Sequence, residues 1–104
     1  MFYVYILYSQ RVDSFYVGQT LNISQRIQEH NSKFYNNSST AKANDWELFF
    51  SIECISRNQS ILIERHIKSM RNRKYYESLK MYPEISDKLK LKYANWKSLC
   101  PRPR

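Results

Sequence analysis

The sequence has a single glycine, Gly18, among its 104 residues. It stands between a strand-like run and a helix-like run, so we expect either φ > 0 or a close backbone approach there. Cysteine is almost as scarce, and Cys54 and Cys100 lie far apart and outside any C-x-x-C spacing. This spacing indicates neither a zinc site nor a disulfide framework, and we expect a reducing, cytoplasmic location.

Long apolar runs are also missing. The apolar stretch at the N-terminus follows no basic region and is too short for a signal peptide or a membrane span, so we expect no membrane association. The sequence shows no internal repeat, no heptad pattern and no second domain. We therefore expect one domain over residues 1–104, with a core at about 2–82 and a helical extension at about 83–104.

Acidic residues are few: 9 Asp and Glu stand against 17 Lys and Arg, which gives a formal net charge of +8. This imbalance favours polyanionic partners, because each neutralised phosphate releases condensed counterions. A merely solubilising surface is the alternative explanation. We expect a nucleic acid as partner.

Two stretches carry candidate nucleic-acid contacts. A polar segment at 35–45 contains Lys42 beside hydroxyl residues, a combination that supplies phosphate donors. Near 71–76, cations interleave with two tyrosines as in phosphate and stacking platforms; the cations are Arg71, Arg73 and Lys74. Alternatively, segment 35–45 is a connecting loop that makes no contact with a nucleic acid. The cations near 71–76 can alternatively belong to a helix terminus, where they interact favourably with the helix dipole.

The first thirty residues predict a β-hairpin followed by a helix. Apolar and aromatic residues fill 2–8 and 15–18, and a polar turn separates the two runs. Successive side chains of a strand point to opposite faces of the sheet. With a suitable pairing of the two strands, Tyr5 and Tyr16 can therefore lie on the same face. We expect Gly18 where the second strand ends.

The helix that follows carries a cation and a histidine. Asn22 is a suitable N-cap for a helix that continues to about Phe34, with an apolar stripe on one side. Arg26 and His30 are four residues apart and are therefore neighbours at the edge of that stripe. Taken alone, Arg26 is typical of an exposed helix arginine, and His30 is typical of a core histidine.

The rest of the chain predicts one strand and three more helices. The elements are a strand at 46–55, a helix that begins with a Ser56–Gln59 capping box, a helix at 74–81 and, after a break at Pro83, a helix near 86–99. The strand alternates, so that Leu48, Phe50 and Ile52 share one face. The helix after Ser56 is apolar nearly all round, and we expect it to be largely covered. The predicted class is α+β, with a small antiparallel three-stranded sheet flanked by helices.

Several of these residues together resemble a known constellation. The sequence is similar to the GIY-YIG nuclease superfamily in two short motifs, Tyr3-Val4-Tyr5 and Tyr16-Val17-Gly18. It also has an arginine ten residues after Tyr16 and a histidine four residues after that arginine, as in that superfamily. The stretch 61–65 resembles the superfamily's helix with the metal-binding glutamate, which here is Glu64. The resemblance spans about 2–82 and is nearest to small single-domain bacterial members, which begin with Y-V-Y in place of G-I-Y.

The resemblance implies roles in phosphodiester hydrolysis. Cleavage needs an activated oxygen nucleophile, neutralised phosphoryl charge and help for the leaving oxygen, and a divalent metal can do two of these jobs. Glu64 would bind Mg²⁺ or Mn²⁺, and Arg26 would hold the scissile phosphate. Tyr5 and Tyr16 would activate or orient the water, and which of them is the base stays open. His30 would accept a proton or bind the phosphate.

The implied function is therefore a metal-dependent DNA endonuclease, directed by DNA structure or by a protein partner in repair or recombination. Two alternatives stay open. Glu64 precedes Lys68 by four residues and can form an ordinary helix ion pair. The protein can also be a catalytically weak or inactive nucleic-acid-binding module that keeps the nuclease fold.

Overall fold

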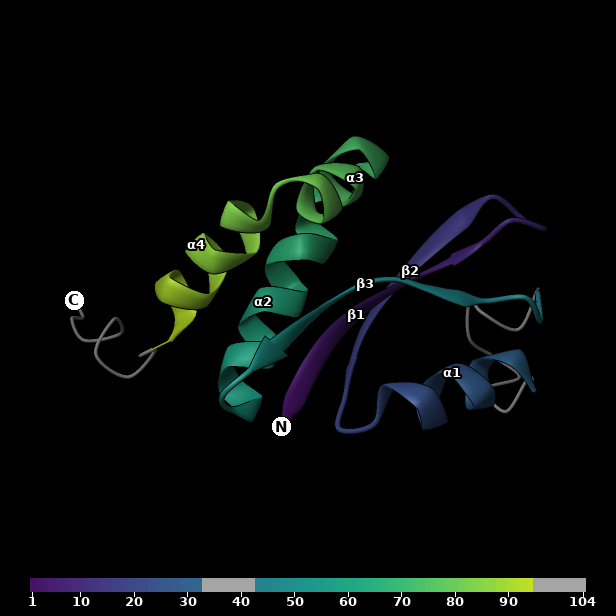
Figure 1. The fold of residues 1–104 in the computed structure, drawn as a ribbon, viewed down its shortest axis with the longest axis horizontal. Helices are drawn as coiled ribbons and strands as arrows, with labels where there is room; N and C mark the ends of the chain where they lie inside the picture. Colours follow the sequence, from purple (N-terminus) through teal and green to yellow (C-terminus); the bar gives the residue numbers. More distant parts are fainter. Residues whose placement is uncertain (33–42, 95–104) are drawn as a thin grey trace.

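A three-stranded antiparallel sheet lies at the centre of the protein, with helices on both of its faces (Figure 1). The structure, a computed structural model, describes residues 1–32 and 43–94. In chain order the elements are β1 (Phe2–Ser9), β2 (Ser14–Thr20), α1 (Ile23–Asn31), β3 (Glu47–Cys54), α2 (Arg57–Met70), α3 (Arg73–Met81) and α4 (Pro83–Tyr93). β1 is central, and β2 and β3 are the edge strands. The predicted α+β class and three-stranded sheet are confirmed.

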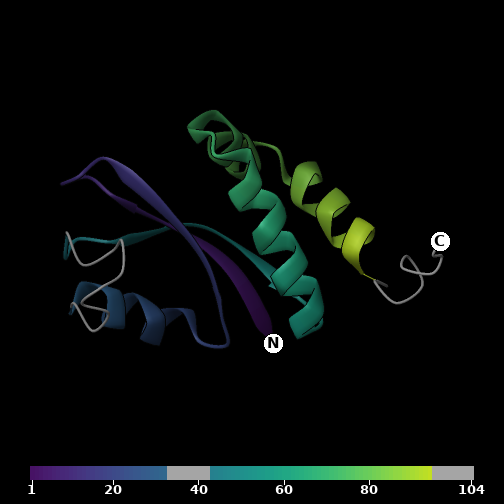
Figure 2. The same ribbon diagram turned by 180° about the vertical axis from the view of Figure 1, so that it is seen from behind.

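Different helices cover the two faces of the sheet (Figures 1 and 2). α1 lies against one face, and α2, accompanied by α3 and α4, lies against the other. Because side chains alternate along a strand, Val4 and Ile6 of β1 belong to the core beneath α2, whereas Tyr5 and Leu7 belong to a cluster beside α1. Both faces of β1 are covered, which explains why its central residues are all buried.

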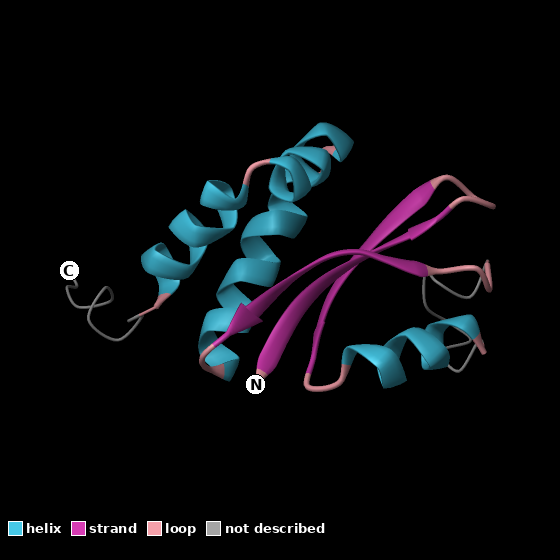
Figure 3. Cartoon of the chain, in the orientation of Figure 1, coloured by secondary structure: helices cyan, strands magenta, loops and turns pink. Residues whose placement is uncertain are grey.

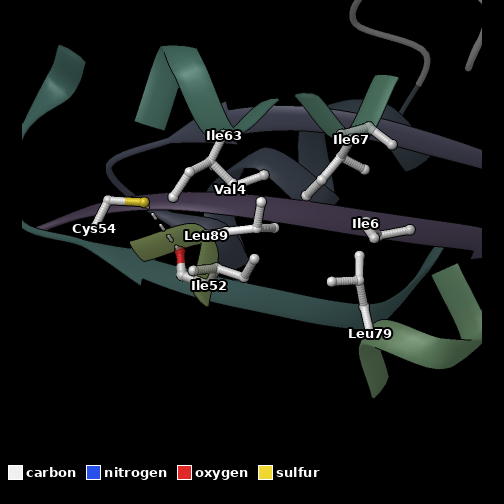
Figure 4. Packing of buried hydrophobic residues seen from close by; sticks show 9 residues of the cluster. Val4, Ile6, Ile52, Cys54, Ile63, Ile67, Leu79 and Leu89 are labelled. Atoms are coloured by element: carbon white, nitrogen blue, oxygen red, sulfur yellow. Dashed lines mark hydrogen bonds between the residues drawn. The ribbon is translucent and has the colours of Figure 1, made fainter. Parts of the chain in front are cut away.

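The face toward α2 carries the larger, aliphatic core (Figure 4). Ile63 and Ile67 of α2 are fully buried and pack against β1 with Val4 and Ile6. The other buried members of this core are Val17, Ile52, Cys54, Leu79 and Leu89. Each fully buried aliphatic side chain contributes about 1.5–3 kcal/mol to folding relative to an exposed one, so this face supplies most of the stability.

α2 is less completely covered than its composition predicts. Of its apolar residues only Ile63 and Ile67 are buried, and Met70 at its end is 42% exposed. The predicted capping contact at its start is present, since the Gln59 N–H donates to Ser56 Oγ at 3.1 Å. The Gln59 side chain also accepts from the Ile55 N–H at 2.7 Å, which links the end of β3 to this helix. No helix in the described part of the chain is long and apolar enough to cross a membrane.

Two predicted helix boundaries differ from the structure. α1 begins after its N-cap Asn22, as predicted, but ends at Asn31 rather than near Phe34, which is outside the described residues. α4 begins at Pro83 itself and not near 86. Proline is favourable at the first helical position, because its missing N–H would have no partner in the helix anyway. The predicted end of this last helix falls outside the described part of the chain.

β3 contains an irregularity that moves one side chain off its predicted face. Ile6 pairs with Phe50, but the next residue of β1, Leu7, pairs with Leu48, so Phe49 has no partner of its own. Such an extra residue bends a strand and interrupts its alternation. Leu48 is consequently 45% exposed instead of sharing the apolar face with Phe50.

Candidate active site

Three predicted site residues meet on the face of the sheet beside α1. Tyr5 Oη lies 3.0 Å from His30 Nε2 in a buried hydrogen bond between β1 and α1. The Tyr16 ring centroid lies 4.9 Å from that of His30 and 6.2 Å from that of Tyr5. Strand register explains this proximity, since Tyr16 pairs with Leu7 and Gly18 pairs with Tyr5, all on one face. We call Tyr5, Tyr16 and His30 the tyrosine–histidine cluster.

Gly18 makes room for this cluster. A Cβ atom at Gly18 would lie 2.6 Å from Tyr5 Oη, 2.8 Å from Tyr5 Cζ and 3.1 Å from Tyr16 Cε2. Its φ is not positive, so of the two properties expected of the lone glycine, only the close approach is present. β2 also continues to Thr20, so the predicted position of Gly18 at the strand end is wrong. The Tyr5 ring needs the space that any other residue would fill.

The two tyrosines differ in accessibility, and the histidine is held neutral. Tyr5 is 1% exposed, whereas Tyr16 is half-buried. Burial, followed by the positive charge of Arg26, lowers the pKa of His30, and Glu29 opposes that shift. A neutral imidazole has one donor and one acceptor nitrogen, so it can accept the Tyr5 hydroxyl proton or donate to its oxygen. Tyr16 is therefore the phenol that can reach a molecule outside the protein.

Arg26 lies one turn before His30 on α1. Its Nε is 3.3 Å from Glu29 Oε1, and its side chain is 35% exposed. It also lines a surface cavity at the end of β2, together with Thr20 and Leu21. Ion pairs this exposed are typically worth about 0–1 kcal/mol, so the contact with Glu29 does not prevent the guanidinium from binding a phosphate.

Glu64 lies on α2, across the edge strand β2 from the tyrosine–histidine cluster. Its Oε2 is 2.8 Å from Lys68 Nζ, so the ion pair that was the alternative to a metal site is present. Ser60, one turn earlier, donates from Oγ to Gln19 Oε1 of β2 at 2.8 Å, which shows that this row of α2 faces β2. The structure shows no hydrogen bond or ion pair between Glu64 and the cluster within the described residues.

A divalent metal would find one protein carboxylate at this position. In the described ranges, no group of three or more His, Cys, Asp or Glu side chains could hold a metal ion. The Glu64 side chain is 16% exposed, and its Oε1 makes no hydrogen bond with the described residues. Mg²⁺ commonly keeps several waters and is bound by one or two carboxylates plus substrate phosphates. This donor set therefore fits an Mg²⁺ or Mn²⁺ ion whose remaining ligands are water and substrate.

Among the predicted nucleic-acid contacts, Arg73 has an internal partner. Its Nη2 lies 2.7 Å from Asp13 Oδ1 and donates to the Asp13 carbonyl at 3.0 Å, which ties α3 to the hairpin turn. Arg73 and Lys74 begin α3, where cations oppose the helix dipole, so the dipole explanation is wrong for these two. Arg71 and Lys74 are exposed. Lys42 lies outside the described residues.

Asn31 positions the cluster, although nothing in the neighbouring sequence distinguishes it. Its Oδ1 accepts from the Trp46 N–H at 2.7 Å, and its Nδ2 donates to the Trp46 carbonyl at 2.9 Å. Trp46 is 3% exposed and belongs to the same buried cluster as Tyr5. This contact fixes the end of α1, and with it His30, against the start of β3. It joins residues far apart in sequence, so no local pattern could have revealed it.

The comparison with known families agrees with this geometry. The model of the GIY-YIG catalytic domain matches residues 1–77 of the 104-residue chain. The match includes the hairpin, α1, β3 and α2, and therefore the tyrosine–histidine cluster, Arg26 and Glu64. No curated protein and no solved structure matches the chain. Because the match covers well over half of the chain, this protein belongs to the GIY-YIG family of endonucleases.

Proposed function

We propose that this protein is a metal-dependent endonuclease that hydrolyses phosphodiester bonds in DNA. The candidate site residues are Tyr5, Tyr16, Arg26, His30 and Glu64. The observation that carries the proposal is the tyrosine–histidine cluster, in which a buried hydrogen bond lies behind a half-buried phenol. Membership of the family adds support, because GIY-YIG nucleases act on DNA and generally depend on a divalent metal.

Tyr16 orients or deprotonates the attacking water, because Tyr5 is buried. To take a proton from water, Tyr16 needs a neighbour that accepts its own proton or stabilises its anion. His30, whose ring centroid is 4.9 Å away, can accept the proton, and Arg26 supplies positive charge nearby. Tyr5 orients His30 through their 3.0 Å hydrogen bond and is a positioning residue.

Arg26 and Glu64 contact the substrate from the two sides of β2. The planar guanidinium of Arg26 matches phosphoryl oxygens in a bidentate manner and neutralises their charge. Glu64 would hold Mg²⁺ or Mn²⁺, and the ion would supply charge stabilisation at the scissile phosphate. The strand to be cut then crosses the edge of the sheet at β2, the strand that carries the half-buried Tyr16.

Cutting is directed by DNA structure or by a protein partner, in repair or recombination and in the cytoplasm. The net charge of +8 supports backbone contacts that carry no sequence information. The exposed Arg71 and Lys74 extend such contacts beyond the site. Selectivity then comes from the shape of the DNA or from a second protein.

A nucleic-acid-binding module that cleaves poorly is the second candidate. One observation favours it: Lys68 occupies one oxygen of Glu64 at 2.8 Å, as expected for a glutamate with a purely structural role. The two candidates differ in what Glu64 does, so this residue decides between them.

A cleavage panel tests the proposal. Single-stranded, duplex, flapped and branched DNA, and RNA, are incubated with Mg²⁺ or Mn²⁺ and with the wild type, Glu64→Gln, Arg26→Ala and the control Glu53→Gln. Glu53 is an exposed carboxylate on β3. We expect Glu64→Gln and Arg26→Ala to lose at least about 10²-fold in rate, as for other charge stabilisers of a transition state, and the control to lose none.

Two results would support the second candidate instead. The first is that the wild type cuts no substrate while it and Glu64→Gln bind DNA with equal affinity. The second is that Lys68→Met and Glu64→Gln change cleavage equally, because Glu64 would then act only as the partner of Lys68.

A further inference from the structure

A second arginine faces the cavity that Arg26 lines. This cavity, with a volume of about 230 Å³, is lined by Phe2, Gln19, Thr20, Leu21, Arg26 and Arg57. Arg26 belongs to α1, and Arg57 is the first residue of α2. Figure 3 shows that the last residues of β2 and the beginnings of β1, α1 and α2 lie at the same end of the sheet. Helices from opposite faces therefore direct one cation each toward the same space.

The charges around this cavity favour an anion. No carboxylate is among the lining residues that the structure describes. Arg57 is exposed and forms no ion pair with any acid that the structure describes. Glu29, the ion-pair partner of Arg26, lines a neighbouring cavity instead. Two cations beside one cavity raise its positive potential, and an anion bound between them removes that repulsion.

The other lining residues favour a nucleotide over a small isolated anion. Gln19 and Thr20 offer polar groups of the kind that contact sugar and phosphate oxygens. Leu21 is 64% exposed and supplies an apolar surface beside them. A ligand that fits this wall has anionic, polar and apolar parts, as a nucleotide within a DNA strand does.

We propose that Arg57 is a second phosphate-binding residue, which holds a phosphate next to the one held by Arg26 on the same strand. The intervening nucleotide lies in the cavity, with its sugar or base against Leu21. This inference rests on the proposed function, because it takes the ligand of Arg26 to be a DNA phosphate. In the described part of the chain no hydrogen bond or ion pair links Arg57 to the tyrosine–histidine cluster, so it positions the strand and does not take part in the chemical step.

The test compares Arg57→Ala with Arg65→Ala, which removes the same charge from an exposed position on the same helix. Binding of a duplex oligonucleotide is measured in a Glu64→Gln background without divalent metal, between about 50 and 200 mM salt, where the slope of log K against log salt reports phosphate contacts. We expect Arg57→Ala to reduce that slope by about 0.9, the value for one contact on duplex DNA, and Arg65→Ala to leave it unchanged. Arg57→Lys keeps the charge and should restore most of the slope.

Cleavage kinetics provide a second readout. In the otherwise wild-type protein, Arg57→Ala should raise KM and leave kcat nearly unchanged, because a positioning contact binds ground state and transition state alike. A slope equal to that of the wild type would overturn the inference. The same decrease in Arg65→Ala would also overturn it, since the charge would then act diffusely. The binding measurement needs no cleavage, so an inactive wild type would refute the proposed function and leave this test intact.

Discussion

β1 contributes to two regions of different chemistry on the two faces of the sheet. Toward α2 its residues Val4 and Ile6 join an aliphatic core closed by Ile63 and Ile67. Toward α1 its residues Tyr5 and Leu7 join a smaller cluster that includes Trp46 and borders His30. The aliphatic core needs only close packing, whereas each polar aromatic group needs a partner at a defined distance and angle.

This difference separates stability from geometry. Aliphatic side chains stabilise the sheet wherever their volume fits, and they tolerate some repacking. The Tyr5–His30 hydrogen bond instead defines one arrangement of β1 relative to α1. Placing the half-buried Tyr16 on the edge strand β2 keeps the polar face accessible to substrate, while the aliphatic face stays closed. If the two faces are independent in this way, a change on one face should leave the property of the other face unaffected.

The largest effect is expected from Tyr16→Phe on the polar face. Loss of a proton-transfer group typically costs about 10²–10⁴-fold in rate, and removing one half-buried hydroxyl should hardly change the denaturation midpoint. Cleavage rate and urea denaturation are measured on the same preparation. Tyr3→Phe, a half-buried tyrosine on β1, is the control. Equal losses in both variants would show that the Tyr16 hydroxyl has no special role.

Ile67→Ala should produce the reverse result on the aliphatic face. Truncating a fully buried isoleucine costs about 2–5 kcal/mol of unfolding free energy, while cleavage per folded molecule should be retained. Leu91→Ala, at a residue that is 78% exposed, should leave the urea midpoint unchanged. If Ile67→Ala lowered the cleavage rate by more than its smaller folded fraction explains, the two faces would not be independent.

Gly18→Ala should affect both properties, because Gly18 faces the polar cluster from within the sheet. The added Cβ would lie 2.6 Å from Tyr5 Oη, and such overpacking costs about 1–3 kcal/mol. Displacement of Tyr5 should also weaken its hydrogen bond to His30, so cleavage per folded molecule falls as well. Urea denaturation and the His30 ring resonances in NMR spectra measure the two effects. A variant with a wild-type midpoint and unshifted resonances would show that the cluster has spare room.

The smallest effect is expected from pH. Burial and the charge of Arg26 lower the pKa of His30, so below its ordinary value of about 6.5 the unfolded state binds more protons than the folded state. The stability contributed by neutral His30 is therefore complete above about pH 6.5 and is lost as pH falls through the lowered folded-state pKa. In His30→Gln, urea midpoints should decline less over this range.

His66 must be separated from this effect, because burial and Lys92 lower its pKa as well. His66→Gln alone should leave the contribution of His30 in place. If only His66→Gln reduced the decrease of the urea midpoint at low pH, the neutral form of His30 would not contribute to folding stability. Asp13 and Asp45, whose pKa values are lowered by hydrogen bonds from Tyr8 and Ser9, titrate at lower pH and do not interfere.

Much of the fold could be predicted because it depends on short-range patterns. Alternation in the hairpin put Tyr5 and Tyr16 on one face, and the N-caps Asn22 and Ser56 accept the expected backbone hydrogen bonds. The start of α4 at Pro83 was missed although it follows a local preference, and a further error arose where distant segments meet. The register shift that exposes Leu48 depends on how β3 pairs with β1, which its own alternation does not contain.

The sequence by itself determined which chemical groups are present and the order in which strands and helices carry them, because spacing and capping act over a few residues. Only the tertiary structure decided that Tyr5 is buried while Tyr16 stays half-buried. It also brought Arg57 to the cavity of Arg26. Each of these outcomes depends on contacts between segments far apart in the chain, and such contacts leave no mark in local sequence.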